Sequence, residues 1–179
     1  MDILESLKNK LLVADGAFGT CYVAMYGEQG TVAPELANIR HPERVLEIHK
    51  EYVKAGAGLI RTNTFAANTA SLDADMDYVI ANVRSAVKLA RQAAADADAD
   101  DKVCIAGDIG PVPGDAGLGL AERVRQYKVL GETMQDMGVD VIWFETFPEF
   151  NVLEPVVKYL KERKDTPIMV SFCVNQFGY

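Results

Sequence analysis

The residues of this sequence that are best suited to chemistry are four polar side chains, each placed just after a short apolar run. They are Asp15, Asn63, Asp108 and Glu145. A short apolar run indicates a buried strand, and folding does not require a carboxylate at its end. Because burying such a charge alone is costly, each carboxylate must face a cleft or find a partner. Carboxylates at strand ends can serve as acid/base groups, as Mg²⁺ ligands or as contacts for a bound substrate.

The run before Glu145 belongs to a segment that occurs twice in the chain. Residues 138–147 (GVDVIWFETF) align without a gap with residues 56–65 (GAGLIRTNTF), and they share Gly, Ile, Thr and Phe. In this alignment Asn63 takes the position of Glu145. We interpret the two segments as strand–helix units of one repeating architecture, each of which ends its strand in a polar residue aimed at a common site.

A glycine-rich turn follows the first apolar run. It comprises residues 15–20 (DGAFGT), and its glycines allow backbone amides to approach a ligand closely. The G-x-G-x-x-G fingerprint of dinucleotide-binding proteins does not occur here, so the turn does not indicate a Rossmann phosphate site.

The elements that position these residues alternate along the chain. Apolar runs predict strands at residues 11–14, 59–62, 103–106, 139–144 and 168–173. Apolar residues at helical spacing predict helices over 42–55, 79–90, 120–137 and 152–160, with Pro42 and Pro155 in first turns. Residues 27–40 contain glycine and proline without periodicity, and they are predicted to form a loop.

Strict alternation of strand and helix predicts an α/β fold with parallel strands and right-handed crossovers. A doubly wound sheet and a (β/α)₈ TIM barrel both fit this pattern. Successive strands that all end in a site residue favour the barrel, in which ligands lie at the carboxyl ends of the strands. Because a complete barrel takes about 250 residues, residues 1–179 are expected to supply the first five βα units of one barrel domain.

Composition excludes several classes of partner. The chain has 179 residues and a net charge of −8, which argues against nucleic acid or an anionic membrane as the main partner. No apolar run approaches the length of about 20 residues that a transmembrane helix needs, and the N-terminus does not resemble a signal peptide.

The cysteines and histidines are dispersed. Cys21, Cys104 and Cys173 form no C-x-x-C pair, so they are predicted to be reduced, small buried residues of a cytoplasmic protein. The only histidines, His41 and His49, lack the spacing of a metal-binding pair. We expect one near a helix cap and the other on a helix surface.

Six short segments follow one another along nearly the whole chain: DGAFGT at 15–20, PELAN at 34–38, EIH at 47–49, TNTF at 62–65, GDIGP at 107–111 and FETF at 144–147. Together they resemble the homocysteine S-methyltransferase family. This family includes betaine–homocysteine methyltransferase and the homocysteine-binding domain of cobalamin-dependent methionine synthase. The first segment looks most like the methionine synthase branch.

The resemblance implies a barrel enzyme that transfers a methyl group to the homocysteine thiolate and produces methionine. It also implies a Zn²⁺ ion held by three cysteine thiolates, which keeps the substrate sulfur deprotonated at neutral pH. Cobalamin on another domain is a further implied cofactor, as a methyl carrier.

The resemblance also implies which residues bind the substrate, namely Asp15, Ala17, Phe18, Asn63, Asp108 and Glu145. The carboxylates of Glu145 and Asp15 suit the ammonium group of homocysteine. Backbone amides at Ala17 and Phe18 suit its carboxylate. Asn63 and Asp108 line the same opening at the end of the barrel.

The family's zinc cysteines follow the sixth and eighth strands, which are expected beyond Tyr179. We therefore assign no metal ligand and no catalytic residue to this chain, and we expect the isolated chain to be inactive. Its partners would be homocysteine and either the missing C-terminal half of the barrel or a second copy of itself.

Two other functions remain open from the sequence. The chain could be a non-catalytic partial barrel that a partner polypeptide completes. It could instead belong to another barrel enzyme, a lyase or an aldolase, that uses Asp15, Asp108 and Glu145 as acid/base groups or Mg²⁺ ligands.

Overall fold

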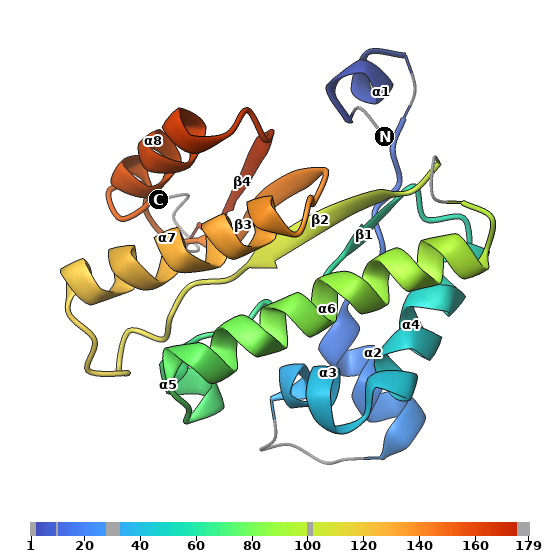
Figure 1. Cartoon of the computed structure of the whole chain (residues 1–179), viewed down its shortest axis with the longest axis horizontal. Helices are drawn as coiled ribbons and strands as arrows, with labels where there is room; N and C mark the ends of the chain where they lie inside the picture. The colour runs from blue at the N-terminus through green and yellow to red at the C-terminus, as the bar shows by residue number, and fades with distance from the viewer. Residues whose placement is uncertain (1–2, 10, 28–32, 100–101, 175–179) are drawn as a thin grey trace.

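A four-stranded parallel sheet lies at the centre of the fold, as a computed structural model of the chain shows (Figure 1). The structure describes residues 3–9, 11–27, 33–99 and 102–174. The strands are β1 (Leu59–Arg61), β2 (Cys104–Ile109), β3 (Val141–Phe147) and β4 (Ile168–Phe172). They pair in chain order and every pair is parallel, which confirms the predicted arrangement of these four strands.

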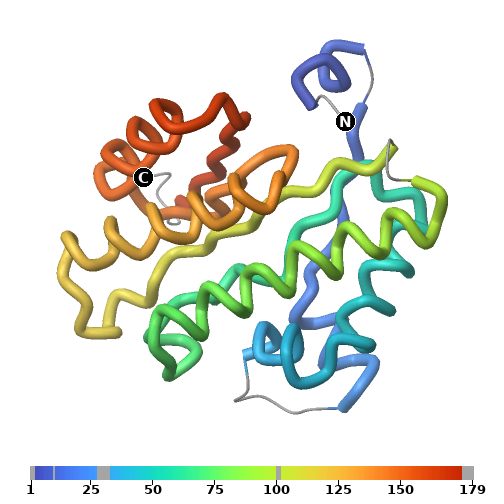
Figure 2. Tube along the Cα trace, viewed as in Figure 1, coloured from blue at the N-terminus to red at the C-terminus, as the bar shows by residue number. Residues whose placement is uncertain are grey.

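Long helices precede and connect the strands. They are α4 (Pro42–Lys54), α6 (Met76–Asp96), α7 (Leu120–Asp136) and α8 (Glu154–Arg163). Pro42 and Pro155 lie in the first turns of α4 and α8, where the missing amide hydrogen removes no helical bond. The traces of α6 and α7 run side by side across one face of the sheet (Figure 2), so this face is covered by helices.

The predicted strand at residues 11–14 is not a regular strand. Only Ala14 forms a bridge, with Leu59 of β1, although the Asp15 amide also donates to the Leu59 carbonyl at 2.9 Å. The segment therefore runs parallel to β1 but does not extend the ladder. Leu11 is 90% exposed, because among the described residues no further strand covers this side. The prediction of five strands is corrected to four strands and one bridge.

The first half of the chain contains more helix than the sequence predicted. The additional helices are α1 (Ile3–Asn9), α2 (Phe18–Tyr26), the 3₁₀ helix η1 (Pro34–Leu36), α3 (Ala37–Arg40) and α5 (Thr69–Leu72). The predicted loop at 27–40 is thus wrong for residues 34–40, while residues 28–32 lie outside the described residues. Tertiary contacts of Asn38, described below, stabilise this short helical segment where periodicity gives no signal.

The two faces of the sheet have different environments. The outer face packs against the helices through Ile60, Ile105 and Ile142. The inner face carries a second apolar cluster with Leu59, Cys104 and Val141, to which Ile3 of α1 contributes. Because side chains alternate along a strand, the inner positions toward the carboxyl ends are Arg61, Asp108 and Glu145. The polar residues of three strands therefore share one face of the sheet.

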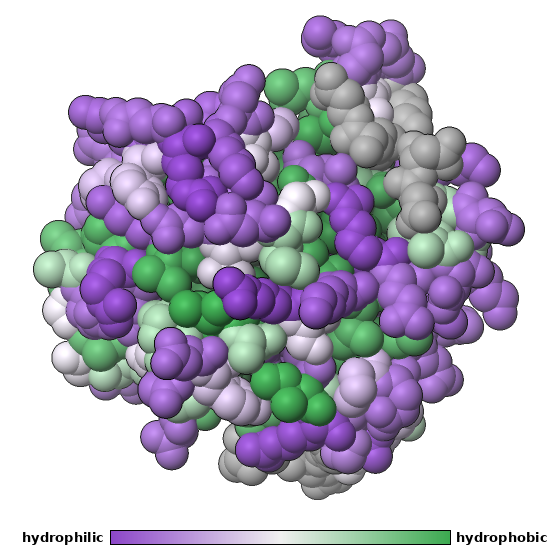
Figure 3. Space-filling view, viewed as in Figure 1, coloured by the Kyte–Doolittle hydropathy of each residue, from purple (hydrophilic) through white to green (hydrophobic). Residues whose placement is uncertain are grey.

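The helical layer is polar on its outer surface. In the view of Figure 3, which looks onto this layer, hydrophilic side chains dominate and hydrophobic ones lie between them. Within the part of the chain that the structure describes, no helix has the length and apolar character needed to span a membrane.

His49 is buried, and its predicted position on a helix surface is wrong. The side chain is 0% exposed, and its ring packs against Phe18 with 5.1 Å between ring centroids. Neither ring nitrogen has a hydrogen-bond partner among the described residues. Burial lowers the pKa of His49 from 6.5 to about 4, because the charged imidazolium loses its hydration. His41 lies at the N-cap of α4, as predicted.

We expect His49 to destabilise the protein at acidic pH. The unfolded chain binds a proton at this residue below its ordinary pKa of 6.5, whereas the folded chain does so only near pH 4. The stabilising contribution is therefore present above pH 6.5 and is lost as the pH falls toward 4, by up to about 3 kcal/mol. Urea unfolding of wild type and His49→Gln between pH 7 and pH 4 measures this effect.

The control for this pH dependence is His41→Gln, because His41 is exposed enough to keep its water contacts at the start of α4. The stability of this variant should follow that of the wild type at each pH. If the free energy of unfolding fell equally with pH in His49→Gln and in wild type, His49 would not be the cause of the loss of stability at acidic pH.

Candidate functional site

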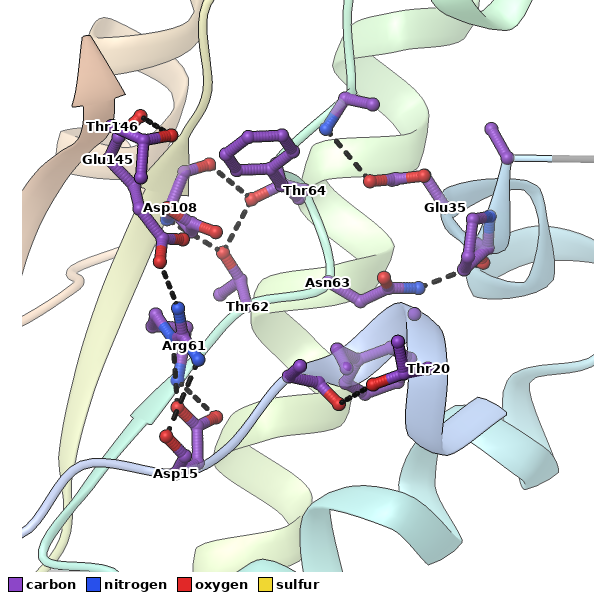
Figure 4. A pocket seen from close by; sticks show the side chains of 17 residues that line it. Asp15, Thr20, Glu35, Arg61, Thr62, Asn63, Thr64, Asp108, Glu145 and Thr146 are labelled. Atoms are coloured by element: carbon purple, nitrogen blue, oxygen red, sulfur yellow. Dashed lines mark hydrogen bonds and ion pairs between the residues drawn. The ribbon is translucent and has the colours of Figure 1, made fainter. Parts of the chain in front are cut away.

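A pocket of about 450 Å³ lies at the carboxyl ends of β1, β2 and β3 (Figure 4). All six residues that were predicted to bind substrate line it: Asp15, Ala17, Phe18, Asn63, Asp108 and Glu145. The structure thus brings these residues together from four separate segments of the chain. Their contact with a ligand stays a prediction.

Arg61 connects two of the predicted carboxylates. Its Nε donates to Asp15 Oδ1 at 2.8 Å, its backbone amide donates to Asp15 Oδ2 at 2.9 Å, and its Nη1 donates to Glu145 Oε1. Nη2 donates to the Gly16 carbonyl at 2.8 Å. The guanidinium also lies 5.4 Å from the ring centroid of Trp143, a distance at which cation–π attraction operates. Figure 4 shows Arg61 between Asp15 and Glu145.

This ion pairing gives the two carboxylates different roles. The Asp15 side chain is 1% exposed and both of its oxygens bind Arg61, so it orients Arg61. Burial raises the pKa of Asp15, and the hydrogen bonds and charge of Arg61 offset part of this rise. The Glu145 side chain is 18% exposed at the pocket. Because a carboxylate offers about four lone-pair sites, Glu145 can still accept from a ligand.

Asp108 is buried beside Glu145. Burial, and next the charge of Glu145 with its hydrogen bond to Asp108, raise the pKa of Asp108 well above the usual range of an aspartate. The raised pKa favours the neutral form of Asp108, because a buried carboxyl group loses its hydration and here lies beside a like charge. The pocket therefore combines one guanidinium with the carboxyl groups of Asp15, Asp108 and Glu145. Because both oxygens of Asp15 accept hydrogen bonds from Arg61, these residues do not offer three free carboxylates to Mg²⁺.

The N-terminus of α2 forms another wall of the pocket. Ala17 is its N-cap residue and supplies no side-chain hydrogen bond to the helix. The first amides of an α-helix have no acceptor within the helix, and together with the helix dipole they attract anions. Residues 17–20 all line the pocket, so this uncapped helix end faces the same space as Arg61 and Glu145.

Asn63 is fixed by a network of buried amides. Its Nδ2 donates to the Pro34 carbonyl at 2.9 Å and to Asn38 Oδ1 at 3.0 Å. Asn38 Nδ2 in turn donates to the Asn63 carbonyl and to Asn82 Oδ1 of α6. Both N–H donors of Asn63 are therefore bonded within the protein. Glu145, which takes the matching position in the repeat, only accepts hydrogen bonds and can still accept one from a ligand.

Glu35 lines the pocket on the side away from Arg61 (Figure 4). Its Oε1 accepts a hydrogen bond from the Ala66 amide at 2.8 Å, and burial raises its pKa. Asn82 Nδ2 donates to the Glu35 carbonyl at 2.7 Å, so the amide network also holds this residue.

The sequence reasoning missed Arg61 and Glu35 as pocket residues. The charge of Arg61, directly after the apolar run at 57–60, was a usable signal, because a charge at an inner strand position needs a partner. Glu35 belongs to a segment that had been interpreted as a loop, so its burial had no sequence signal.

The described cysteines do not form a metal site. Cys104 is buried at the start of β2, Cys21 is partly exposed and Cys173 is exposed, so the prediction of three buried thiols holds only for Cys104. All three are free thiols. Among the described residues no group of three His, Cys, Asp or Glu side chains could hold a metal ion.

Comparison with known proteins gives one family. A model of the family described as "Homocysteine S-methyltransferase" matches residues 12–177. The chain is 26% identical to betaine–homocysteine S-methyltransferase 1 of Sus scrofa, over 98% of this chain and 64% of that protein. It is 31% identical to methionine synthase of Mycobacterium tuberculosis (strain ATCC 25618 / H37Rv), over 87% of this chain and 14% of that protein. The chain thus spans less than two thirds of either relative.

Solved structures give a matching fold. The oxidized form of the homocysteine methyltransferase MmuM from Escherichia coli superposes with a TM-score of 0.83 at 23% identity, over 98% of this chain and 66% of that one. Its metallated form superposes with a TM-score of 0.77 at 23% identity, over 94% of this chain and 65% of that one. At this identity the similarity establishes the fold alone.

Proposed function

Because the chain belongs to the homocysteine S-methyltransferase family, we propose that its pocket binds homocysteine for methyl transfer to the sulfur. In the intact protein the thiolate would attack the methyl group of a donor, so that an S–CH₃ bond forms, the donor–CH₃ bond breaks and methionine results. This chain would supply the part of the site that holds the amino acid end of the substrate.

The observation that carries this proposal is the placement of opposite charges on two walls of one pocket. Glu145 presents a partly exposed carboxylate, and the uncapped N-terminus of α2 presents backbone amides. An α-amino acid carries an ammonium and a carboxylate on the same carbon, and these two walls suit both groups. Glu145 would accept the ammonium, and the amides at Ala17 and Phe18 would donate to the carboxylate. Asp15 would act by holding Arg61.

The residues that would hold the proposed zinc and cobalamin lie outside the described part of the chain. The described side chains do not fit a zinc site, because Cys104 lies at the opposite end of β2 from Asp108 and the pocket. The proposed cytoplasmic location is supported by the three free thiols.

Calorimetric titration of the protein with L-homocysteine tests the proposed substrate. Two analogues serve as controls: 4-mercaptobutanoate, which lacks the ammonium, and 3-aminopropane-1-thiol, which lacks the carboxylate. We expect each analogue to bind at least about tenfold more weakly, since each loses a charge-assisted contact. Homocysteine binding no tighter than that of both analogues would contradict the proposed recognition.

We further propose that the isolated chain associates with itself or with the remaining part of a barrel. In the described part of the chain β4 pairs only with β3, and Phe172 at its end is exposed. An unpaired parallel edge with apolar side chains is a template for pairing with another chain. We expect light scattering at micromolar concentration to give a mass above the 19.6 kDa of one chain.

The matched variant for association is Phe172→Lys, because a charged residue on an edge strand opposes pairing. This variant should shift the mass toward 19.6 kDa. A wild-type monomer that unfolds cooperatively would show that the open edge is closed in another way, and the partial-barrel proposal would then be wrong.

A further inference from the structure

The strand that carries Glu145 contains a β-bulge at the pocket. Phe144 pairs with Val170 and Phe147 pairs with Phe172, so Glu145 and Thr146 together stand opposite the single residue Ser171. Thr146 has a φ angle of 56°, in the left-handed region, which β-branched residues rarely adopt. Bulges often re-aim a side chain beside a functional site.

The bulge changes which face of the sheet the following residues reach. In a regular strand Phe144 and Phe147 would point to opposite faces. Here both belong to the same outer core, with 5.7 Å between their ring centroids. The extra residue therefore lets Glu145 line the pocket while Phe147 returns to the core two positions later.

One hydroxyl group fastens this arrangement. Ser171 Oγ accepts a hydrogen bond from the Thr146 amide at 2.9 Å and another from Trp143 Nε1 at 3.2 Å. Trp143 lies beneath the Arg61 guanidinium, which in turn binds Glu145. The Ser171 hydroxyl thus holds the Thr146 peptide, which is next to Glu145. It also holds the Trp143 ring, which lies against Arg61, the cationic partner of Glu145.

We propose that Ser171 is a positioning residue that sets the orientation of Glu145 and Arg61 in the pocket. Without the hydroxyl, the Thr146 amide loses its acceptor and the left-handed conformation loses the bond that fixes it. Trp143 also loses the hydrogen bond from its indole N–H, which fixes the orientation of the ring beneath Arg61. The proposal deepens the proposed function and rests on it for the identity of the ligand.

Two variants distinguish the effect of the Ser171 hydroxyl from the effect of changing the residue. Ser171→Ala removes the acceptor, and Ser171→Thr keeps it on a residue that suits a strand. Thr133→Ala is the control, because it removes a hydroxyl bonded to the Val129 carbonyl within α7, away from the pocket. Trp143 is the only tryptophan of the chain, so its fluorescence reports on this site alone.

We expect Ser171→Ala to change the emission wavelength and iodide quenching of Trp143 and to weaken homocysteine binding by about tenfold or more. Ser171→Thr should restore both properties, and Thr133→Ala should leave both unchanged. Wild-type affinity in Ser171→Ala, or a Ser171→Thr variant that behaves like Ser171→Ala, would overturn the proposal.

The fluorescence readout keeps the two proposals distinguishable. If the wild-type protein does not bind homocysteine, the proposed substrate is wrong, and Trp143 emission alone decides the role of Ser171. A changed emission in Ser171→Ala that Ser171→Thr restores would then still support positioning. Unchanged emission in Ser171→Ala would refute it whatever the ligand.

Discussion

Replacement of Arg61 by methionine is expected to lower the free energy of unfolding by about 3–5 kcal/mol. The variant keeps most of the side-chain volume but leaves Asp15 and Glu145 without their cation. The Asp15 side chain is almost completely buried, so water cannot replace the lost hydrogen bonds. Removing one partner of a buried ion pair is far more costly than breaking a surface pair. Urea unfolding followed by circular dichroism measures the difference.

Two further variants test this explanation. Arg125→Met removes a surface arginine that pairs with Glu122 one helical turn away, and it should leave stability close to wild type. Adding Asp15→Asn and Glu145→Gln to Arg61→Met removes the stranded charges and should recover part of the loss. Equal stability of Arg61→Met and Arg125→Met would show that the three charged groups are not coupled in the folded protein.

Replacement of Glu145 by alanine is expected to weaken homocysteine binding by about 2–5 kcal/mol. The reason is that the ammonium group of the ligand would lose its partly buried counter-charge, while the N-terminus of α2 would still hold the carboxylate. The loss should be smaller for 4-mercaptobutanoate, which has no ammonium. Calorimetric titration of both ligands measures the two losses.

The matched control for Glu145 is Glu149→Ala, because Glu149 is an exposed carboxylate just beyond β3 that bonds only to Asn151 among the described contacts. This variant should bind homocysteine like the wild type. If Glu145→Ala also retained wild-type affinity, the assignment of the ammonium to Glu145 would be wrong, although the fold and the family would stand.

The parts of the fold that the sequence predicted well are those determined by local pattern. Helices α4, α6, α7 and α8 carry apolar residues at helical spacing, and proline marks the starts of α4 and α8. Strand β2 is buried along its whole length and β3 is mostly buried up to Phe144, so both contain apolar runs. Local signals thus located the strand ends, and therefore the pocket.

The parts that the sequence did not predict depend on contacts between distant residues. Arg61 finds Asp15 and Glu145 at separations of 46 and 84 residues, and no local spacing indicates such pairs. His49 is buried and has no hydrogen-bond partner among the described residues, which contradicts the usual preference of polar side chains for water or a partner. The edge segment at 11–14 has strand composition, but regular pairing needs a neighbour that composition does not specify.

The amide network of Asn38, Asn63 and Asn82 has a consequence for the entropy of ligand binding. It ties the segment that carries Glu35 both to the end of β1 and to the buried side of α6. A wall held in this way is ordered before any ligand arrives. Ordering a loop on binding reduces affinity, and a preorganised wall avoids this reduction. The side of the pocket formed by this segment therefore keeps its conformation when a ligand binds, and the ligand must adopt the conformation that fits it.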